Sequence, residues 1–81
     1  LLYLLGDAYF KIKQYQQSLS IYQQALPIAK EITNKSLEAQ ILDRIGDSYF
    51  NLQQYDQAIA AYQKALPVAQ EAKNQGLTAN I

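Results

Sequence analysis

Residues 1–40 and residues 41–80 of this 81-residue chain are two copies of one sequence pattern. When the first copy is laid over the second, 18 of the 40 aligned positions are identical, and Ile81 would open a third copy. A fixed period of this size is typical of solenoids, in which each repeat is one supersecondary unit that buries its apolar face against the next. We therefore expect a single domain made of two such units.

Each copy contains two helical patterns. In the second half of copy 1, apolar residues recur every three or four positions, which places them on one face of a helix. This stripe consists of Tyr15, Leu19, Tyr22, Leu26 and Ala29, and its counterpart in copy 2 consists of Tyr55, Ile59, Tyr62, Leu66 and Ala69. Stretches of alternating β-branched residues, which would indicate strands, do not occur in the sequence.

Short polar segments separate the helical patterns, the last of them at residues 73–76. The pattern therefore predicts an all-α fold, a right-handed solenoid of antiparallel helix–turn–helix units. The expected helices cover residues 1–13, 16–33, 36–53 and 56–73, followed by the start of a fifth helix.

Pro27 and Pro67 occupy equivalent positions inside the second helical pattern of each copy. Proline in a helix interior removes a backbone hydrogen bond and costs about 3 kcal/mol. A defect would not be expected twice at one aligned position, and the apolar stripe continues beyond each proline. We therefore predict that helices 16–33 and 56–73 continue through their prolines and bend there, with the proline on the convex side.

Small and large residues are spaced in a way that indicates which helical repeat this is. Small residues let two helix backbones approach, and neighbouring large residues such as Leu5 and Tyr9 fill the space around that contact. The small positions are Gly6, Ser18 and Ala25 in copy 1, and Gly46, Ala58 and Ala65 in copy 2. This spacing, with the repeated GD-Y-F element, resembles the tetratricopeptide repeat.

The resemblance covers the whole chain but departs from the family in two ways. The period here is longer than the family's usual repeat of about 34 residues, and Lys30 and Gln70 stand where the family has its closing proline. The alternative is a HEAT-type repeat, whose period is about 40–47 residues and which does not require the observed spacing of small residues.

Composition limits the possible functions. The net charge is zero, which removes the simplest electrostatic case for binding nucleic acid or an anionic membrane. No apolar run approaches the roughly 18 residues of a membrane span. The sequence has neither cysteine nor histidine, so it lacks a thiol nucleophile and the commonest general base. We expect no enzyme activity and no cofactor in this segment, unless a neighbouring domain completes a site. The lack of cysteine is also compatible with a cytoplasmic location.

The chain contains no methionine and begins within a helical pattern. We therefore expect it to be a fragment of a larger protein. Its repeats, with the ending ALPIA, resemble those of bacterial and especially cyanobacterial repeat arrays.

The family resemblance implies a concave groove, lined by the first helix of each repeat, that holds a peptide of a partner protein. Chaperone-binding members of the family use lysine and asparagine in this groove to hold a C-terminal carboxylate. Here Asp7 and Asp47 replace the asparagine, and Tyr3 and Asp43 replace the lysine. The full set of groove positions is Tyr3, Asp7, Phe10 and Lys11 in copy 1, and Asp43, Asp47, Phe50 and Asn51 in copy 2, with Gln40 near the entrance.

Three carboxylates in the groove would repel a carboxylate terminus. The expected partner is therefore a protein or peptide with a basic side chain and an apolar or aromatic anchor. Two other interpretations of these residues remain open. Asp43 and Asp47, one helical turn apart, are a candidate pair for a hard cation or a solvated face beside Arg44, and Phe10 and Phe50 are alternative core residues.

The ends of the chain are apolar. Four of the first five residues are leucine, and residues 77–81 form an apolar stub at the other end. Solenoids need polar capping repeats and about three repeats for stability. We therefore expect the isolated fragment to self-associate. The alternative to groove binding is a structural role, in which the repeats space or assemble other domains.

Overall fold

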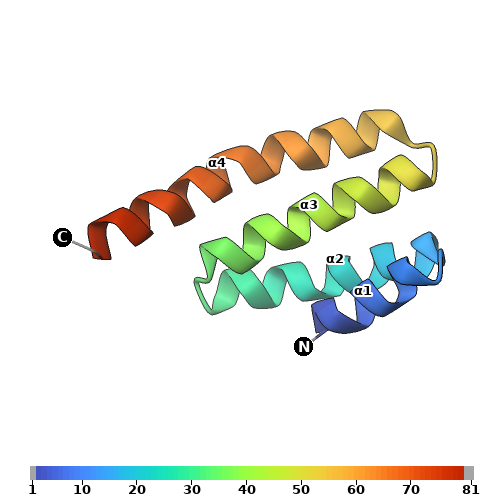
Figure 1. Cartoon of the computed structure of the whole chain (residues 1–81), viewed down its shortest axis with the longest axis horizontal. Helices are drawn as coiled ribbons and strands as arrows, with labels where there is room; N and C mark the ends of the chain where they lie inside the picture. Colours follow the sequence, from blue (N-terminus) through green and yellow to red (C-terminus); the bar gives the residue numbers. More distant parts are fainter. Residues whose placement is uncertain (1, 80–81) are drawn as a thin grey trace.

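The computed structural model describes residues 2–79, with side chains over residues 2–73. It consists of four α-helices in chain order (Figure 1), α1 (Leu2–Lys11), α2 (Tyr15–Glu31), α3 (Lys35–Asn51) and α4 (Tyr55–Ala79). Each helix packs on the next along the chain, α1 on α2, α2 on α3 and α3 on α4. The described residues contain no strand. The predicted all-α architecture of antiparallel helix pairs is confirmed.

The first three connections lie where the sequence predicts them, but the fourth does not exist. Residues 73–76 belong to α4, which continues to Ala79. The expectation that a helix ends at residue 73 was therefore wrong. Gly76 weakens a helix by only about 1 kcal/mol relative to alanine, which is too little to end a helix whose backbone bonds are otherwise intact. The third copy expected from Ile81 lies outside the described residues.

The three connections share one geometry. Lys13, Thr33 and Gln53 adopt the left-handed conformation, with φ of 65°, 56° and 64°. In each connection the next amide donates to a carbonyl five residues earlier, as in the bond of 2.9 Å from the Gln14 amide to the Tyr9 carbonyl. This Schellman arrangement satisfies carbonyls that the helix end would leave unpaired and turns the chain back on itself.

Both prolines lie inside helices. Pro27 is exposed on α2, which continues to Glu31, and Pro67 is exposed on α4. The predicted continuity of both helices is confirmed, and the bend at each proline stays a prediction.

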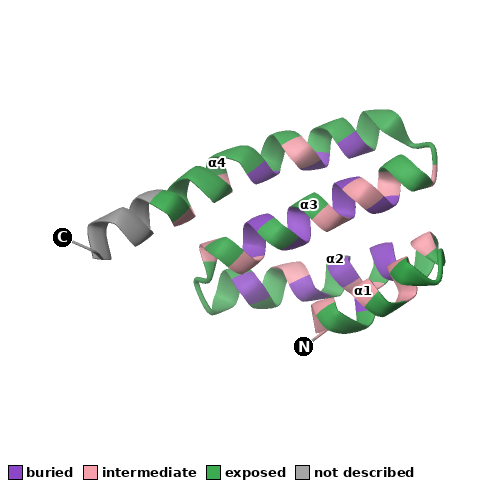
Figure 2. Ribbon diagram, in the orientation of Figure 1, coloured by how far each residue is buried: buried purple, intermediate pink, exposed green. Residues whose placement is uncertain are grey.

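Buried residues gather along the facing sides of α2, α3 and α4 (Figure 2). The central cluster consists of Leu19, Tyr22, Ala25, Ala29, Ile41, Ile45 and Ala61. The predicted contact of small with large residues is present within each repeat. A Cβ added to Gly6 would lie 2.6 Å from Cε1 of Tyr22, and one added to Gly46 would lie 2.6 Å from Cε1 of Tyr62. Each glycine therefore lets a tyrosine ring lie directly against the backbone of the partner helix.

Candidate functional site

A cleft of about 450 Å³ lies between α1, α2 and α3, and we call it the α1–α3 cleft. Its lining combines apolar side chains with charged ones of both signs. The lining residues are Leu4, Asp7, Ala8, Phe10, Lys11, Tyr22, Arg44 and Asp47. The structure therefore brings together four of the nine residues that the family resemblance assigned to a groove, namely Asp7, Phe10, Lys11 and Asp47.

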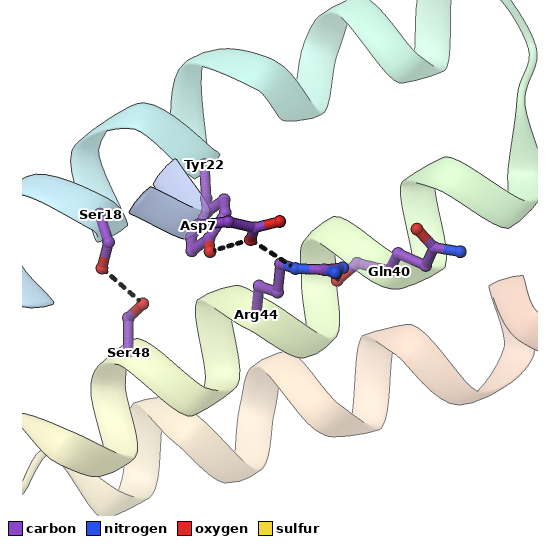
Figure 3. A network of polar contacts seen from close by, with 6 residues as sticks. All are labelled: Asp7, Ser18, Tyr22, Gln40, Arg44 and Ser48. Atoms are coloured by element: carbon purple, nitrogen blue, oxygen red, sulfur yellow. Dashed lines mark hydrogen bonds and ion pairs between the residues drawn. The ribbon is translucent and has the colours of Figure 1, made fainter. Parts of the chain in front are cut away.

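Asp7 joins three helices at the wall of this cleft (Figure 3). The Tyr22 hydroxyl on α2 donates to its Oδ1 at 2.5 Å. Arg44 Nε on α3 lies 2.7 Å from the same oxygen. The carboxylate that the sequence suggested as a free groove charge is therefore neutralised by Arg44 and held in place by Tyr22.

Asp47 has only part of this arrangement. The Tyr62 hydroxyl on α4 donates to its Oδ1, as Tyr22 does to Asp7. However, neither Asp47 nor Asp43 forms an ion pair with any residue that the structure describes. Asp7 is therefore neutralised by Arg44, whereas Asp47 on α3 and Lys11 on α1 line the same cleft without an ion-pair partner among the described residues, so the charges of the lining sum to zero.

The two tyrosines have perturbed acidities. Burial, together with the bond to Asp7 and the charge of Asp7, raises the pKa of Tyr22 well above its ordinary value. Burial and then the bond to Asp47 raise the pKa of Tyr62 to about 12. Both hydroxyls therefore keep their protons at neutral pH and act as donors to the carboxylates.

Sequence reasoning missed half of the cleft lining. Tyr22 was assigned to the apolar core and Arg44 to a solvated face, and Leu4 and Ala8 were not considered as groove residues. A signal for the tyrosines was present, because the interval from Asp7 to Tyr22 equals the interval from Asp47 to Tyr62. No comparable signal identifies Arg44, since the aligned residue in copy 1 is Leu4.

The two phenylalanines hold the connections within each repeat. The Phe10 ring packs edge-on against Tyr15, with ring centroids 5.1 Å apart, and Phe50 packs in the same way against Tyr55 at 5.2 Å. Phe10 is half-buried and lines the cleft, whereas Phe50 is exposed. The alternative assignment of Phe50 to the core was therefore wrong.

The remaining predicted groove residues lie outside the α1–α3 cleft. Tyr3 is half-buried and packs against the central cluster. Gln40 and Asp43 are exposed and border a separate shallow hollow beside α4. Asn51 donates from Nδ2 to the backbone carbonyl of Asp47 at 2.8 Å. These side chains lie along the same helices but are not gathered into one site.

A hydroxyl pair links α2 to α3 beside the cleft. Ser18 and Ser48 are fully buried, with their Oγ atoms 3.0 Å apart, and Ser18 also donates to the carbonyl of Tyr15 at 2.8 Å. No buried side-chain nitrogen or oxygen among the described residues lacks a partner. The two serines therefore stabilise the contact between the repeats.

The same helix-packing contact occurs in both repeats, between Gly6 and Tyr22 and between Gly46 and Tyr62. A comparison with known families also identifies the chain as a helical repeat. The sequence profile of the Tetratricopeptide repeat family matches residues 1–71. The chain belongs to this family. Tetratricopeptide repeats are protein-interaction scaffolds and generally not catalytic, so protein binding is the function class to consider. No curated protein and no solved structure gave a match.

The described residues offer neither a membrane-spanning helix nor a cluster of metal ligands. Among the helices described, none has an apolar stretch that would cross a bilayer. Within the same part of the chain, no group of three or more side chains is placed to ligate a metal ion. Asp43 and Asp47 therefore have no third carboxylate beside them.

Proposed function

We propose that this segment is a scaffold that binds a partner protein through a peptide held in the α1–α3 cleft. The observation that carries the proposal is the combination of an apolar wall with one carboxylate that has no ion-pair partner among the described residues. Leu4, Ala8 and Phe10 supply the apolar wall, and Asp47 supplies the charge. Ligand pockets commonly combine apolar contact with a few placed polar groups that fix orientation.

The charge distribution supports a specific partner chemistry. Because Arg44 already neutralises Asp7, the attraction for a cation is concentrated at the α3 side of the cleft, at Asp47 and, just outside the cleft, at Asp43 one turn away, whereas Lys11 lies on the α1 side. A lysine or arginine of the peptide would bind there, and an apolar or aromatic side chain would pack on Leu4 and Phe10. A C-terminal carboxylate would meet repulsion from the same two aspartates.

Two peptides that differ only in charge test this proposal. Both are blocked at their ends and contain one phenylalanine, and one carries two lysines where the other carries two glutamates. Fluorescence anisotropy is expected to show that the lysine peptide binds the chain at least tenfold more tightly, which corresponds to about 1.4 kcal/mol. Asp43→Asn with Asp47→Asn should remove most of this preference, because asparagine keeps an acceptor for Tyr62 but not the charge.

Asp56→Asn is the matched control, since Asp56 is exposed on α4 and does not line the cleft. Circular dichroism of each variant should match that of the parent chain. Equal affinity for the two peptides, or equal loss in the Asp56 control, would contradict the proposed partner chemistry.

A structural role is the second candidate function. The observation that favours it is an apolar face of α4 that no described residue covers, including Ile59 and Leu66. Such a face suits stacking on further repeats or on another chain, which is consistent with the expected self-association. The cytoplasmic location stays a prediction.

A further inference from the structure

We propose that two copies of this chain join head to tail, with α1 of one copy docking on α4 of the other. In this joint, α1 would take the place that α3 has on α2 within a single chain, and α4 would take the place of α2. This inference concerns assembly and does not depend on peptide binding in the α1–α3 cleft.

An apolar face of α4 is exposed. We define the α4 docking face as Ile59, Leu66 and Ala69, which align with Leu19, Leu26 and Ala29 of α2. In α2, where α3 covers this face, Leu19 is only 5% exposed. In α4, Ile59 is 54% exposed and Leu66 is 64% exposed, and they border a hollow of about 330 Å³. The α4 docking face is therefore a second, uncovered copy of the surface that receives α3.

An apolar face of α1 is exposed as well. We define the α1 docking face as Leu5, Ala8 and Ile12, a stripe along α1 and the residue after it, which aligns with Ile45, Ser48 and Leu52 of α3. Ile45 is 6% exposed and borders a hollow with Gln23 and Leu26 of α2. Its equivalent Leu5 is 46% exposed, and Ile12 is 61% exposed. The α1 docking face is therefore an uncovered copy of the surface that α3 presents to α2.

The polar pairs at the existing interface also have compatible equivalents. Gln23 Nε2 donates to the Tyr49 hydroxyl at 3.2 Å, and the aligned residues, Gln63 and Tyr9, are the same two types.

The buried hydroxyl pair of Ser18 and Ser48 would become the pair Ala58 and Ala8. Two methyl groups replace two hydroxyls, so the joint between copies leaves no buried hydroxyl without a partner.

One pair does not match. At the existing interface Arg44 Nε lies 2.7 Å from Asp7, whereas the aligned residues at the joint between copies are Leu4 and Asp47. In addition, the described part of α1 has 10 residues and α3 has 17. The joint therefore buries less surface and lacks one ion pair, and assembly should depend on concentration. Because the two docking faces differ, the contact is heterologous and can extend to further copies.

Blocking one face at a time tests the proposal. One variant carries Leu5→Glu and Ile12→Glu, and the other carries Ile59→Glu and Leu66→Glu. Sedimentation velocity between about 10 μM and 1 mM should show the parent chain growing beyond its mass of 9.2 kDa. Each variant alone should stay monomeric, because each lacks one of the two faces. An equimolar mixture should form a dimer that stops growing, since only one joint can form.

These outcomes separate head-to-tail assembly from other forms. Dimers of the α1-blocked variant alone would show that α4 faces pair with one another, and a monomeric mixture would show that the faces do not meet. Either result overturns the proposal, as does a parent chain that remains monomeric at 1 mM. All four substituted side chains are substantially exposed, so circular dichroism should show unchanged helicity.

A gain-of-function variant tests the register. Leu4→Arg would place a guanidinium beside Asp47 of the next copy, reproducing the pair of Arg44 with Asp7. Dimerisation should tighten about two- to five-fold at low salt and less at high salt, as exposed ion pairs do. Adding Asp47→Asn should abolish the gain. No gain, or an equal gain in the double variant, would overturn the proposed register.

Discussion

Helices α2 and α4 carry nearly the same apolar stripe but lie in different surroundings. α2 is packed between α1 and α3, whereas α4 packs mainly on α3 (Figure 2). Tyr22 and Ala29 are fully buried in α2. In α4, the equivalent of Tyr22, Tyr62, is half-buried, and the equivalent of Ala29, Ala69, is exposed. The sequence of a repeat therefore sets which face is apolar, and the neighbouring repeat sets whether that face is buried. This dependence is the physical reason why stability in solenoids includes a term for each interface between neighbouring repeats.

The largest expected difference between the helices concerns their aligned aliphatic residues. Leu19→Ala should lower the free energy of unfolding by about 2–5 kcal/mol, because it removes buried methyl groups and leaves a cavity. Ile59→Ala should cost less than about 1 kcal/mol, since its side chain is already solvated and alanine favours the helix. Urea unfolding followed by circular dichroism at about 5 μM protein measures both values.

The concentration matters because assembly would cover Ile59. If the two alanine variants lose equal stability even at low concentration, then the α4 face is buried in solution and the comparison of α2 with α4 fails.

A smaller difference is expected at the two glycines. Gly6→Ala would push a methyl group into the Tyr22 ring, which is confined under α3, and should cost about 1–3 kcal/mol. Gly46→Ala meets the Tyr62 ring at the same distance, but that ring is half-exposed and has room to move outward. The gain in helix propensity, about 0.5–1 kcal/mol, should then offset the strain. Thermal unfolding of the two variants compares them directly, and a larger loss in Gly46→Ala would contradict the idea that the covering repeat confines the ring.

The fold could be read from the sequence because the repeat supplied the same signals twice. The small residues at Gly6 and Gly46, the apolar stripes and the polar connections all agree with one architecture, and such agreement between levels is typical of sequences that specify a fold. The end of α4 could not be read in the same way. Residues 73–76 contain turn-forming residue types, as does the aligned segment 33–36. The chain turns back at Thr33, between the end of α2 and the start of α3, whereas α4 continues through residues 73–76.

The candidate site was only partly readable for a different reason. The family resemblance assigned four of the lining residues to a groove, because it implies which face of the first helix in each repeat is concave. These residues are Asp7, Phe10, Lys11 and Asp47. The partners of Asp7 could not be predicted in this way, because a sequence does not show that Tyr22 and Arg44 reach the same oxygen from two other helices. A charge that appeared free in the sequence is therefore bound in the structure, and the groove is less negative than three aspartates suggest.

The smallest expected difference concerns the tyrosine hydroxyls. Tyr22→Phe and Tyr62→Phe each remove a donor to an aspartate, and each should cost about 0.5–1.5 kcal/mol. The loss should be greater for Tyr22, because burial strengthens its bond, while water can replace Tyr62 at Asp47. Urea unfolding at neutral pH measures both, and the Asp7→Asn and Asp47→Asn backgrounds serve as controls in which each loss should shrink.

The pH dependence of the same two variants gives a further test. A pKa raised on folding means that the folded state favours the protonated phenol, so its contribution to stability is complete below the ordinary tyrosine pKa of about 10. For Tyr62 this contribution should be lost as the pH rises from about 10 to about 12, where its hydroxyl titrates in the folded chain. The free energy of unfolding of the parent chain should therefore fall over this range, and more steeply than that of Tyr62→Phe. Absorbance at 295 nm should show that Tyr62→Phe lacks a titration step near pH 12. Identical slopes in the two proteins would mean that burial and Asp47 do not hold the Tyr62 proton in solution, and that α4 lacks the equivalent of the hydrogen bond that Tyr22 of α2 donates to Asp7.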